Sequence, residues 1–225
     1  MYNFSPDKEV KDFKNKLKNR NIKGLVLDVD ETLSWTFRYW VERMQIQFGN
    51  PENLSIIDIV QKYKYHRNVP YWQTDEAREW AEFAKNDNKT QENLPLITKS
   101  NSTVRKINQI IPIIRYLTAR PRSVVSGTQK WLDKHSFPKA NILARPTDMT
   151  TSQGNEWKAK VLEFLYPQIL GIVDDNTSVV DNLSPNYKGV IYLYNNETTD
   201  NKSLNIIPCK TWPEVHKQIK LRQFS

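Results

Sequence analysis

The chain has 225 residues, enough for one or two domains with a buried core. Hydrophobic residues make up 38% and charged residues 26%, which excludes a mainly disordered chain and a coiled coil. No apolar run is long enough to cross a bilayer, residues 1–20 lack the apolar stretch of a secretory signal, and the one cysteine, Cys209, cannot form an internal disulfide. We therefore expect a cytoplasmic protein with no membrane partner, while the sequence does not indicate an oligomeric state.

The charge is unevenly distributed along the chain. The formal net charge is +8, from 33 Lys and Arg and 25 Asp and Glu. Residues 24–34 carry Asp28, Asp30 and Glu31 and no basic residue, whereas residues 100–225 carry an excess of seven positive charges. This pattern suits a metal cation together with an anionic substrate, although a generally basic surface would give the same totals.

Several short apolar runs predict buried strands. An amphipathic helix is expected first, within residues 3–20, and the run Ile22–Leu27 follows it and ends at Asp28. The later runs are Ile110–Leu117, ending at Thr118, with Pro112 placed at the strand start; a weaker run, Asn141–Ala144; Ile169–Val173, ending at Asp174; and Gly189–Tyr194. Helical patterns accompany them at Thr103–Ile107, Thr128–His135, Trp157–Leu165 and Trp212–Leu221. The alternation predicts an α/β fold, a Rossmann-like, doubly wound parallel sheet.

Residues 35–99 have a different composition. They hold eleven of the 25 aromatic residues and show helical spacing at Thr36–Phe48, Ile56–Tyr65 and Thr74–Ala84. This segment is too long for a loop. We expect an α/β core made of residues 1–34 and 100–225, with residues 35–99 inserted after the first strand as a small helical cap.

Polar residues gather where the predicted strands end. In an open parallel sheet, ligands bind beyond the carboxyl ends of the strands, so Asp28, Asp30, Thr118, Asp174 and Asp175 should converge. The repulsion between these carboxylates requires a cation, and hard oxygen ligands favour Mg²⁺. A carboxylate can also act as a nucleophile toward phosphorus. The alternative for the first cluster is a polar turn after a strand, where Asp is common.

Four motifs together resemble the haloacid dehalogenase superfamily, specifically its phosphatase branch. They are DVDET at 28–32, Thr118 in YLTARP, Lys158 in NEWKAK, and Asp174-Asp175 in GIVDDN. Their order and strand contexts match across roughly residues 22–195, and residues 35–99 stand where that family often carries a cap. Any one motif would be weak, but the four together are specific.

The resemblance implies roles for the first acidic cluster and for the threonine motif. Asp28 would be the nucleophile and a Mg²⁺ ligand. Asp30 would be the general acid–base, with its backbone carbonyl on the metal, and it favours a phosphate monoester because ion-pumping ATPases have Thr there and dehalogenases lack this acid. Thr118 would bind a phosphoryl oxygen through its hydroxyl, beside the backbone N–H groups of the turn at Ala119 and Arg120.

The resemblance also implies roles for the later motifs. Lys158 would neutralise charge on Asp28 and on the phosphoryl group, and Lys160 is its rival two residues on. Asp174 would bind Mg²⁺. Asp175 would hold a metal-bound water or orient Lys158.

Three arginines near the strand ends are further candidates. Arg120 and Arg122 follow Thr118 and could grip a second anionic group of the substrate, or they could only cover the surface. Arg145, in LARPT after another strand, is a similar candidate.

The leading functional prediction is a Mg²⁺-dependent phosphatase that hydrolyses a phosphorylated small molecule through an aspartyl phosphate. One alternative acts on nucleotides or nucleic-acid 3′ ends, because the motif order also resembles the phosphatase domain of polynucleotide kinase. The basic excess in residues 100–225 and the YKYHR stretch at 63–67 favour nucleic acid, while the neutral segment 35–99 and the missing kinase P-loop weigh against it. Another alternative is a non-catalytic basic binding module on the same scaffold.

Overall fold

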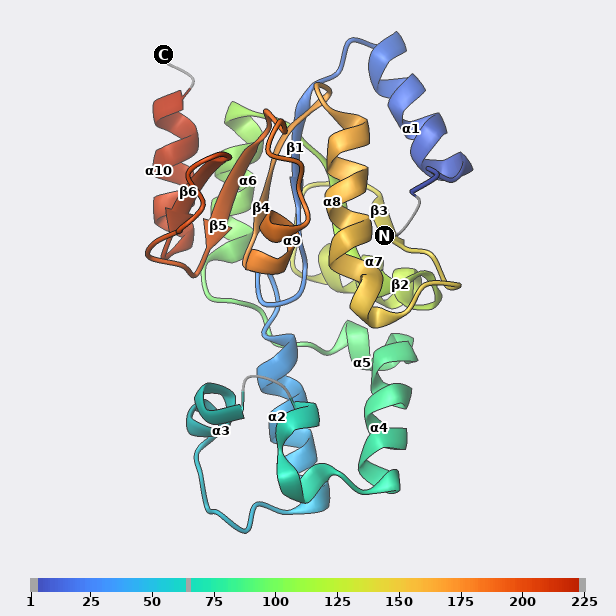
Figure 1. Ribbon diagram of the computed structural model, residues 1–225, viewed down its shortest axis with the longest axis vertical. Coiled ribbons are helices and arrows are strands. Elements are labelled where there is room, and N and C mark those ends of the chain that lie inside the picture. Colours follow the sequence, from blue (N-terminus) through green and yellow to red (C-terminus); the bar gives the residue numbers. More distant parts are fainter. Residues whose placement is uncertain (1–3, 64–65, 223–225) are drawn as a thin grey trace.

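A computed structural model describes residues 4–63 and 66–222 of the chain. Its centre is a six-stranded, all-parallel sheet in the order β3-β2-β1-β4-β5-β6 (Figure 1). The strands are β1 (Gly24–Leu27), β2 (Ile113–Pro121), β3 (Ile142–Arg145), β4 (Ile169–Asp174), β5 (Val190–Tyr194) and β6 (Asn205–Cys209). This order is that of the doubly wound nucleotide-binding folds, so the predicted α/β, Rossmann-like class is confirmed.

Helices cover both faces of the sheet. One face packs in a hydrophobic cluster with α6 (Ser100–Ile110), α7 (Val125–Lys134) and α10 (Trp212–Arg222). The other packs with α1 (Lys8–Asn19), α8 (Gly154–Leu165) and α9 (Thr177–Asp181). The two clusters explain why the central strands are continuously apolar, because each strand is buried on both sides.

The first helix shows how local sequence sets these elements. The carboxylate of Asp7 accepts a hydrogen bond from the Val10 backbone N–H at 3.0 Å and so caps α1. Val10, Phe13 and Leu17 are buried at helical spacing, while the other faces carry charged residues. The amphipathic pattern within residues 3–20 therefore forms a helix, although Phe4 precedes it.

The second strand begins and ends later than expected. Ile110 belongs to α6, and Pro112 lies before β2, where its carbonyl still accepts a bond from the Leu25 N–H at 2.9 Å. Beyond Thr118 the strand continues to Pro121 with a shift in its pairing to β3. The apolar run was misassigned at its start because the last turn of a helix and a buried strand carry the same residue types.

Two elements at the C-terminal side were not predicted. These are α9 and the edge strand β6, which contains Pro208 and tolerates it because β6 pairs only with β5. Cys209 ends β6 and is fully buried, as expected for a small apolar residue.

Between β1 and α6 the regular elements of the described residues are helices, apart from isolated β-bridges that join Ser34 to Asp30 and to Leu96. The helices are α2 (Thr36–Phe48), α3 (Ile56–Tyr63), α4 (Asp75–Asn86) and α5 (Asn88–Glu92), with two short 3₁₀ turns at His66–Asn68 and Pro70–Trp72. Further 3₁₀ turns lie at Arg122–Val124 and Thr151–Gln153. Figure 1 shows α2, α3 and α4 grouped beyond the end of the sheet where β1 leads out.

This group has its own buried cluster, which includes Val41, Met44, Ile59, Val69, Trp72 and Ala77. The expected helix at Thr36–Phe48 has these bounds, and Thr74 caps α4 by accepting from the Ala77 N–H at 3.2 Å. Tyr65 lies outside the described residues. The division into a core and a cap at residues 34/35 and 99/100 stays a prediction. No helix in the described part of the chain is both long and apolar enough to cross a membrane.

Candidate active site

Three carboxylates meet between β1 and β4. Asp28 directly follows β1, and Asp174 ends β4, which is the neighbouring strand in the sheet. The Asp28 N–H donates to the Val173 carbonyl at 3.0 Å, which places the two strand ends at one level. One carboxylate oxygen from each of Asp28, Asp174 and Asp175 lies within 4.8 Å of the others. The cluster sits where the strand order reverses direction, the usual ligand position in such sheets.

Lys158 joins two of these carboxylates. Its ammonium donates to Asp28 Oδ1 at 2.7 Å and to Asp174 Oδ2 at 2.9 Å, and the side chain is buried. Its rival Lys160 instead pairs with Glu163 on the same helix at 3.1 Å. Helix α8 begins at Gly154, where an added Cβ would lie only 2.8 Å from the Ala119 Cβ. The missing side chain lets the start of the helix approach the Thr118 turn closely, and Lys158 follows one turn later on the same helix.

The electrostatic balance of the cluster is negative. Burial raises the pKa of the Asp28 carboxyl to about 7; Lys158 opposes this shift and Asp174 adds to it. Burial, followed by the charges of Asp174 and Asp28, also raises the pKa of Asp175 well above its usual value. Burial alone would lower the pKa of Lys158, but Asp174 and Asp28 outweigh it and raise that pKa. Three carboxylates therefore share one ammonium, and their hard oxygen donors fit a divalent metal cation.

Thr32 connects the two acidic segments, although sequence reasoning did not select it as a site residue. Its hydroxyl donates to Asp175 Oδ1 at 2.9 Å, and it accepts from the Asp175 N–H at 3.2 Å. Its carbonyl accepts from the Trp212 indole N–H at 3.0 Å. Thr32 is the last residue of the DVDET motif, and this position was the one sequence signal that could have selected it as a site residue.

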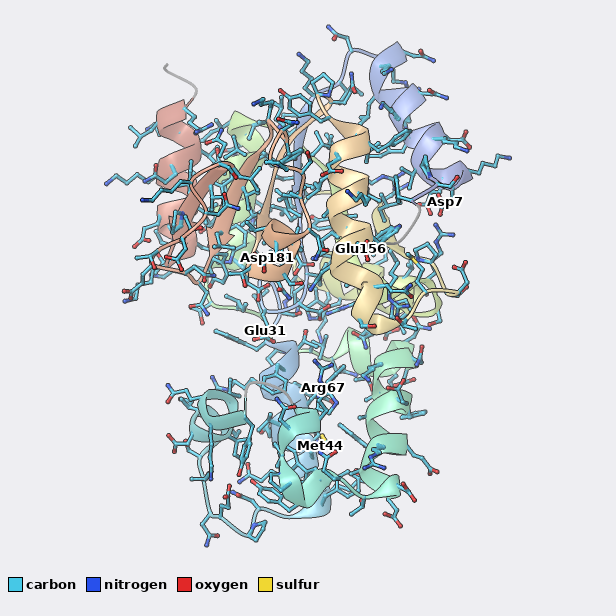
Figure 2. All side chains as sticks on the ribbon, in the orientation of Figure 1. Asp7, Glu31, Met44, Arg67, Glu156 and Asp181 are labelled. Carbon is cyan, nitrogen blue, oxygen red and sulfur yellow. The ribbon has the colours of Figure 1, made fainter. Side chains whose placement is uncertain are left out.

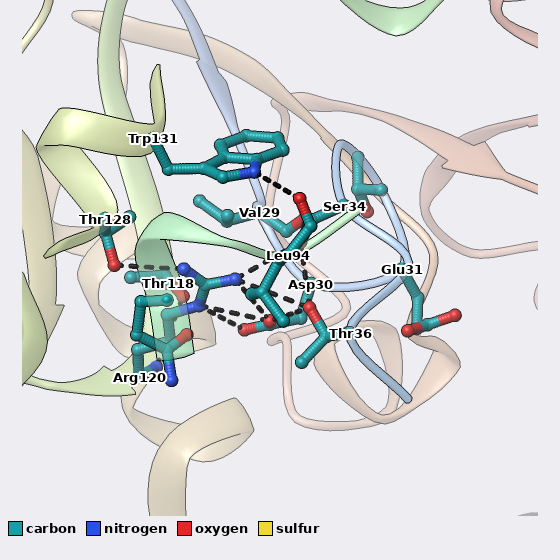
Figure 3. A network of polar contacts seen from close by, with 12 residues as sticks. Val29, Asp30, Glu31, Ser34, Thr36, Leu94, Thr118, Arg120, Thr128 and Trp131 are labelled. Atoms are coloured by element: carbon teal, nitrogen blue, oxygen red, sulfur yellow. Dashed lines mark hydrogen bonds and ion pairs between the residues drawn. The ribbon is translucent and has the colours of Figure 1, made fainter. Parts of the chain in front are cut away.

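Asp30 lies apart from this cluster, paired with Arg120 (Figure 3). The Arg120 guanidinium donates from Nε to Asp30 Oδ2 at 3.0 Å and from Nη2 to Asp30 Oδ1 at 2.7 Å. It also donates to the hydroxyls of Thr128 at 3.0 Å and Ser34 at 3.2 Å. Thr36, the first residue of α2, donates to Asp30 Oδ1 at 2.5 Å. Arg120 and Thr36 thus hold the Asp30 carboxylate in place.

This arrangement fixes the charge of Asp30. Burial alone would raise the pKa of its carboxyl, but the charge and hydrogen bonds of Arg120 outweigh burial and hold that pKa below its usual value. Arg120 was expected to bind an anion of the substrate, yet its guanidinium is directed at Asp30 in this structure. Substrate binding by Arg120, and metal binding by the Asp30 backbone carbonyl, stay predictions.

Thr118 lies on β2, the strand on the other side of β1 from β4. It is buried, and its hydroxyl accepts from the Arg120 N–H at 3.2 Å. The Ala119 carbonyl accepts from Arg145 Nε at 3.0 Å. The turn is therefore held from within by the Arg120 N–H and from the neighbouring strand by the Arg145 side chain.

The other two candidate arginines lie in different surroundings. Arg122 pairs with Asp7 and, at 3.4 Å, with Glu9 at the start of α1, so it ties that helix to the end of β2. Arg145 ends β3, and its side chain is buried. The structure brings Arg145, and not Arg122, beside the Thr118 turn.

Glu31 is a further residue that sequence reasoning did not select. Figure 2 shows it between the sheet and the α2–α4 group. Its backbone is left-handed, with φ of 53°, and its carboxylate accepts from the Phe37 N–H at 2.6 Å near the start of α2. Burial raises the pKa of Glu31 to about 7. The signal available in the sequence was the place of Glu31 inside the motif DVDET at 28–32.

The YKYHR stretch is only partly described. The Tyr63 hydroxyl donates to Glu52 at 2.7 Å, and its ring meets Tyr71 edge-on with centroids 6.5 Å apart. Residues 64 and 65 lie outside the described residues. Tyr63 therefore packs with the α2–α4 group.

Comparisons with known proteins add one distant likeness. No protein-family model matches the chain, and neither does any curated protein. A solved structure of cytosolic 5′-nucleotidase IIIB bound to cytidine is similar, with 12% sequence identity, coverage of 96% of this chain and 93% of that chain, and a TM-score of 0.34. The parallel strand order and the aspartate cluster beyond β1 and β4 are those that the resemblance to the haloacid dehalogenase superfamily implies.

Proposed function

We propose that the chain is a Mg²⁺-dependent phosphatase that hydrolyses a phosphate monoester through a phosphoaspartate at Asp28. The observation that supports it most is the meeting of Asp28, Asp174 and Asp175 around Lys158 at the carboxyl ends of β1 and β4. The site combines a carboxylate nucleophile with a positive group beside it, which is what transfer of a phosphoryl group requires.

The three clustered carboxylates would hold the metal, together with the backbone carbonyl of Asp30. When bound, Mg²⁺ offsets the negative charge of the cluster and polarises a phosphoryl oxygen. Lys158 would stabilise the added charge on the phosphoryl group from its place beside Asp28. The Thr118 hydroxyl accepts from the Arg120 N–H, so its own proton is available to a phosphoryl oxygen.

The reaction proceeds in two steps. A carboxylate oxygen of Asp28 forms a bond to phosphorus while the bond to the leaving oxygen breaks, and that oxygen takes a proton from the protonated form of Asp30, which the Arg120 ion pair makes the minor form. Asp30 then takes a proton from water, the water oxygen attacks phosphorus, and the Asp28–phosphorus bond breaks to release phosphate.

The Arg120 ion pair favours the second of these steps. It stabilises the ionised form of Asp30, which is the form that activates water. Esters whose leaving group needs little protonation, such as aryl phosphates, should therefore react faster than alkyl phosphates. The ratio of the two rates measures how far Asp30 limits the first step.

The direct test is hydrolysis of an aryl phosphate with Mg²⁺ and with excess EDTA. Asp28→Asn should lower turnover by at least about 10³-fold with an unchanged circular dichroism spectrum. The exposed Asp200→Asn is the matched control and should keep wild-type turnover. Rapid quenching should trap a hydroxylamine-sensitive phosphate on the peptide that contains Asp28. Turnover that survives in Asp28→Asn, or that EDTA leaves unchanged, would contradict the proposal.

The basic excess of residues 100–225 supports a polyanionic substrate as a second candidate. A nucleic-acid 3′-end phosphatase should act on short oligonucleotides with a rate that falls steeply with salt. Binding of the polyanion releases its counterions, so added salt weakens that binding. Hydrolysis of small esters that is insensitive to salt would favour the small-molecule substrate. Inactivity across all phosphates, with intact fold and metal binding, would favour the non-catalytic binding module.

A further inference from the structure

Three basic side chains are buried in the described part of the chain, and only two of them face an opposite charge. Arg120 pairs with Asp30, and Lys158 pairs with Asp28 and Asp174. Arg145 is 6% exposed, and within residues 4–63 and 66–222 no carboxylate lies within ion-pair distance of it. A buried charge without a counter-charge is costly, so this guanidinium calls for an anion.

The contacts that Arg145 does make are neutral. Its Nε donates to the Ala119 carbonyl at 3.0 Å, and its Nη1 donates to the Met149 carbonyl. These bonds hold the guanidinium in one orientation without cancelling its charge. Burial accordingly lowers the pKa of Arg145, and the distant charge of Glu82 opposes that shift. An anion bound here would find donors already positioned.

Arg145 lines a cavity of about 480 Å³ between the ends of β2 and β3 and helix α4. Most of the other lining residues are polar: Glu82, Asn86, Ser123, Thr147 and Thr150. The hydroxyls among them are exposed at the mouth, so a ligand can enter from solvent. A space of this size and polarity suits a charged substituent and not an apolar ring.

The cavity adjoins the proposed reaction site. Thr118 pairs with Ala144, so Arg145 extends β3 just past the level of the threonine. A Cβ added at Gly154 would lie 3.3 Å from the Arg145 Cδ, and Lys158 stands one turn further along the same helix. A ligand with one group at Asp28 and another at Arg145 would therefore pass the Thr118 turn.

We infer that Arg145 binds a second anionic group of the substrate, a carboxylate or a phosphate, in this cavity. The inference rests on the proposed function and deepens it, because it names the substrate class as phosphate monoesters that carry another negative group. Glu82 faces the same cavity, but its carboxylate pairs with Lys85 on α4 and stands beyond ion-pair distance from Arg145. The substrate, and not the protein, supplies the missing charge.

The test uses two series of alkyl phosphates of two to five carbons. In one series the far end is a carboxylate or a second phosphate, and in the other it is a neutral amide. For the best chain length, the wild-type chain should show kcat/KM at least about tenfold higher for the anionic ester, mainly through KM. Arg145→Gln should reduce this ratio to below about twofold, and the exposed Arg78→Gln on α4 should keep it.

Arg145→Gln removes donors to two carbonyls, so its fold is checked first by circular dichroism. If it does not fold, the exposed Ser123→Asp places a negative charge in the same cavity and should lower the ratio by itself. A ratio near one at every length in the wild-type chain would overturn the inference, as would a ratio that survives both substitutions.

Failure of the proposed function is recognised separately. If no ester is hydrolysed, calorimetry with butane-1,4-diol bisphosphate still measures binding to the wild-type chain and to Arg145→Gln. Binding that the substitution weakens at least about tenfold would support the anion site. Equal binding by the two proteins, or none by the wild-type chain, would overturn it.

Discussion

In metal-free buffer, raising the pH from 5 to 7 should destabilise the folded chain, because Asp28 must lose its proton inside the acidic cluster. Its pKa is about 7 in the folded state and 3.8 as a free side chain. A carboxyl with a raised pKa stabilises the fold fully below pH 3.8, and this contribution is lost as the pH rises through 7. Each pH unit in that window removes up to about 1.4 kcal/mol, and the loss levels off near pH 7, so Asp28 alone accounts for about 2 kcal/mol between pH 5 and 7.

Other groups with shifted pKa values also change the unfolding free energy between pH 5 and 7. Glu31, with a pKa of about 7 raised by burial, adds to the loss in the same direction. Asp30 has a lowered pKa, so its stabilising contribution is present above pH 4 and is lost only in acid. Asp175, whose pKa burial also raises, adds to the loss, whereas His66, whose pKa burial lowers to about 4, opposes it because its neutral form is favoured in the fold. Between pH 5 and 7 the slope therefore reports Asp28, Glu31 and Asp175 against His66.

The assay is urea unfolding in EDTA, followed by tryptophan fluorescence, since Trp72, Trp131, Trp157 and Trp212 are buried. Asp28→Asn should make the loss of unfolding free energy between pH 5 and 7 clearly smaller, and Asp200→Asn should not change it. Saturating Mg²⁺ at pH 7 should restore stability to the wild-type chain by binding the folded state. A free energy that is constant or rises from pH 5 to 7, or a slope unchanged in Asp28→Asn, would refute the reasoning.

Three further substitutions test the structure. Arg120→Met should lower the free energy of unfolding by about 2–3 kcal/mol in urea, less than for a fully buried pair because the Asp30 side chain is 33% exposed. Gly127→Ala should lower it by about 1–3 kcal/mol, seen as a lower Tm, because the new Cβ would lie 2.2 Å from the Asn88 carbonyl oxygen. Lys99→Gly should raise the Tm, by about 1 kcal/mol of stability, because Lys99 has a φ of 67° in the left-handed region and is exposed.

The sequence predicted the central fold because its strands are short apolar runs that end in acidic or polar residues. Leu25 to Leu27 and Ile169 to Val173 are buried on both faces, so their composition alone marks them as central strands. The edge strand β6 has only partly buried residues before Cys209 and contains a proline. It was missed because an edge strand carries a weaker apolar signal.

The sequence predicted that Asp28, Asp174 and Asp175 converge because all three follow or end parallel strands, whose carboxyl ends lie at one edge of the sheet. This prediction needs no knowledge of side-chain conformation. The partner of Asp30 could not be obtained in this way. Arg120 and Asp30 are 90 positions apart, and whether the guanidinium turns toward the acid or toward a ligand depends on Ser34, Thr36 and Thr128 packing around it. Such choices between nearby partners are made by tertiary packing, which spacing in the sequence does not encode.

The hydrogen bonds at the start of α2 give the loop after β1 a second consequence. Thr36 binds the carboxylate of Asp30, and the Phe37 N–H binds Glu31, so the first turn of α2 and the acidic loop are joined at two points. A rotation of α2 relative to the sheet must then swing the Asp30 carboxylate with it. Substitutions at the far end of this helix should thus shift the Asp30 carboxylate without touching the acidic cluster itself.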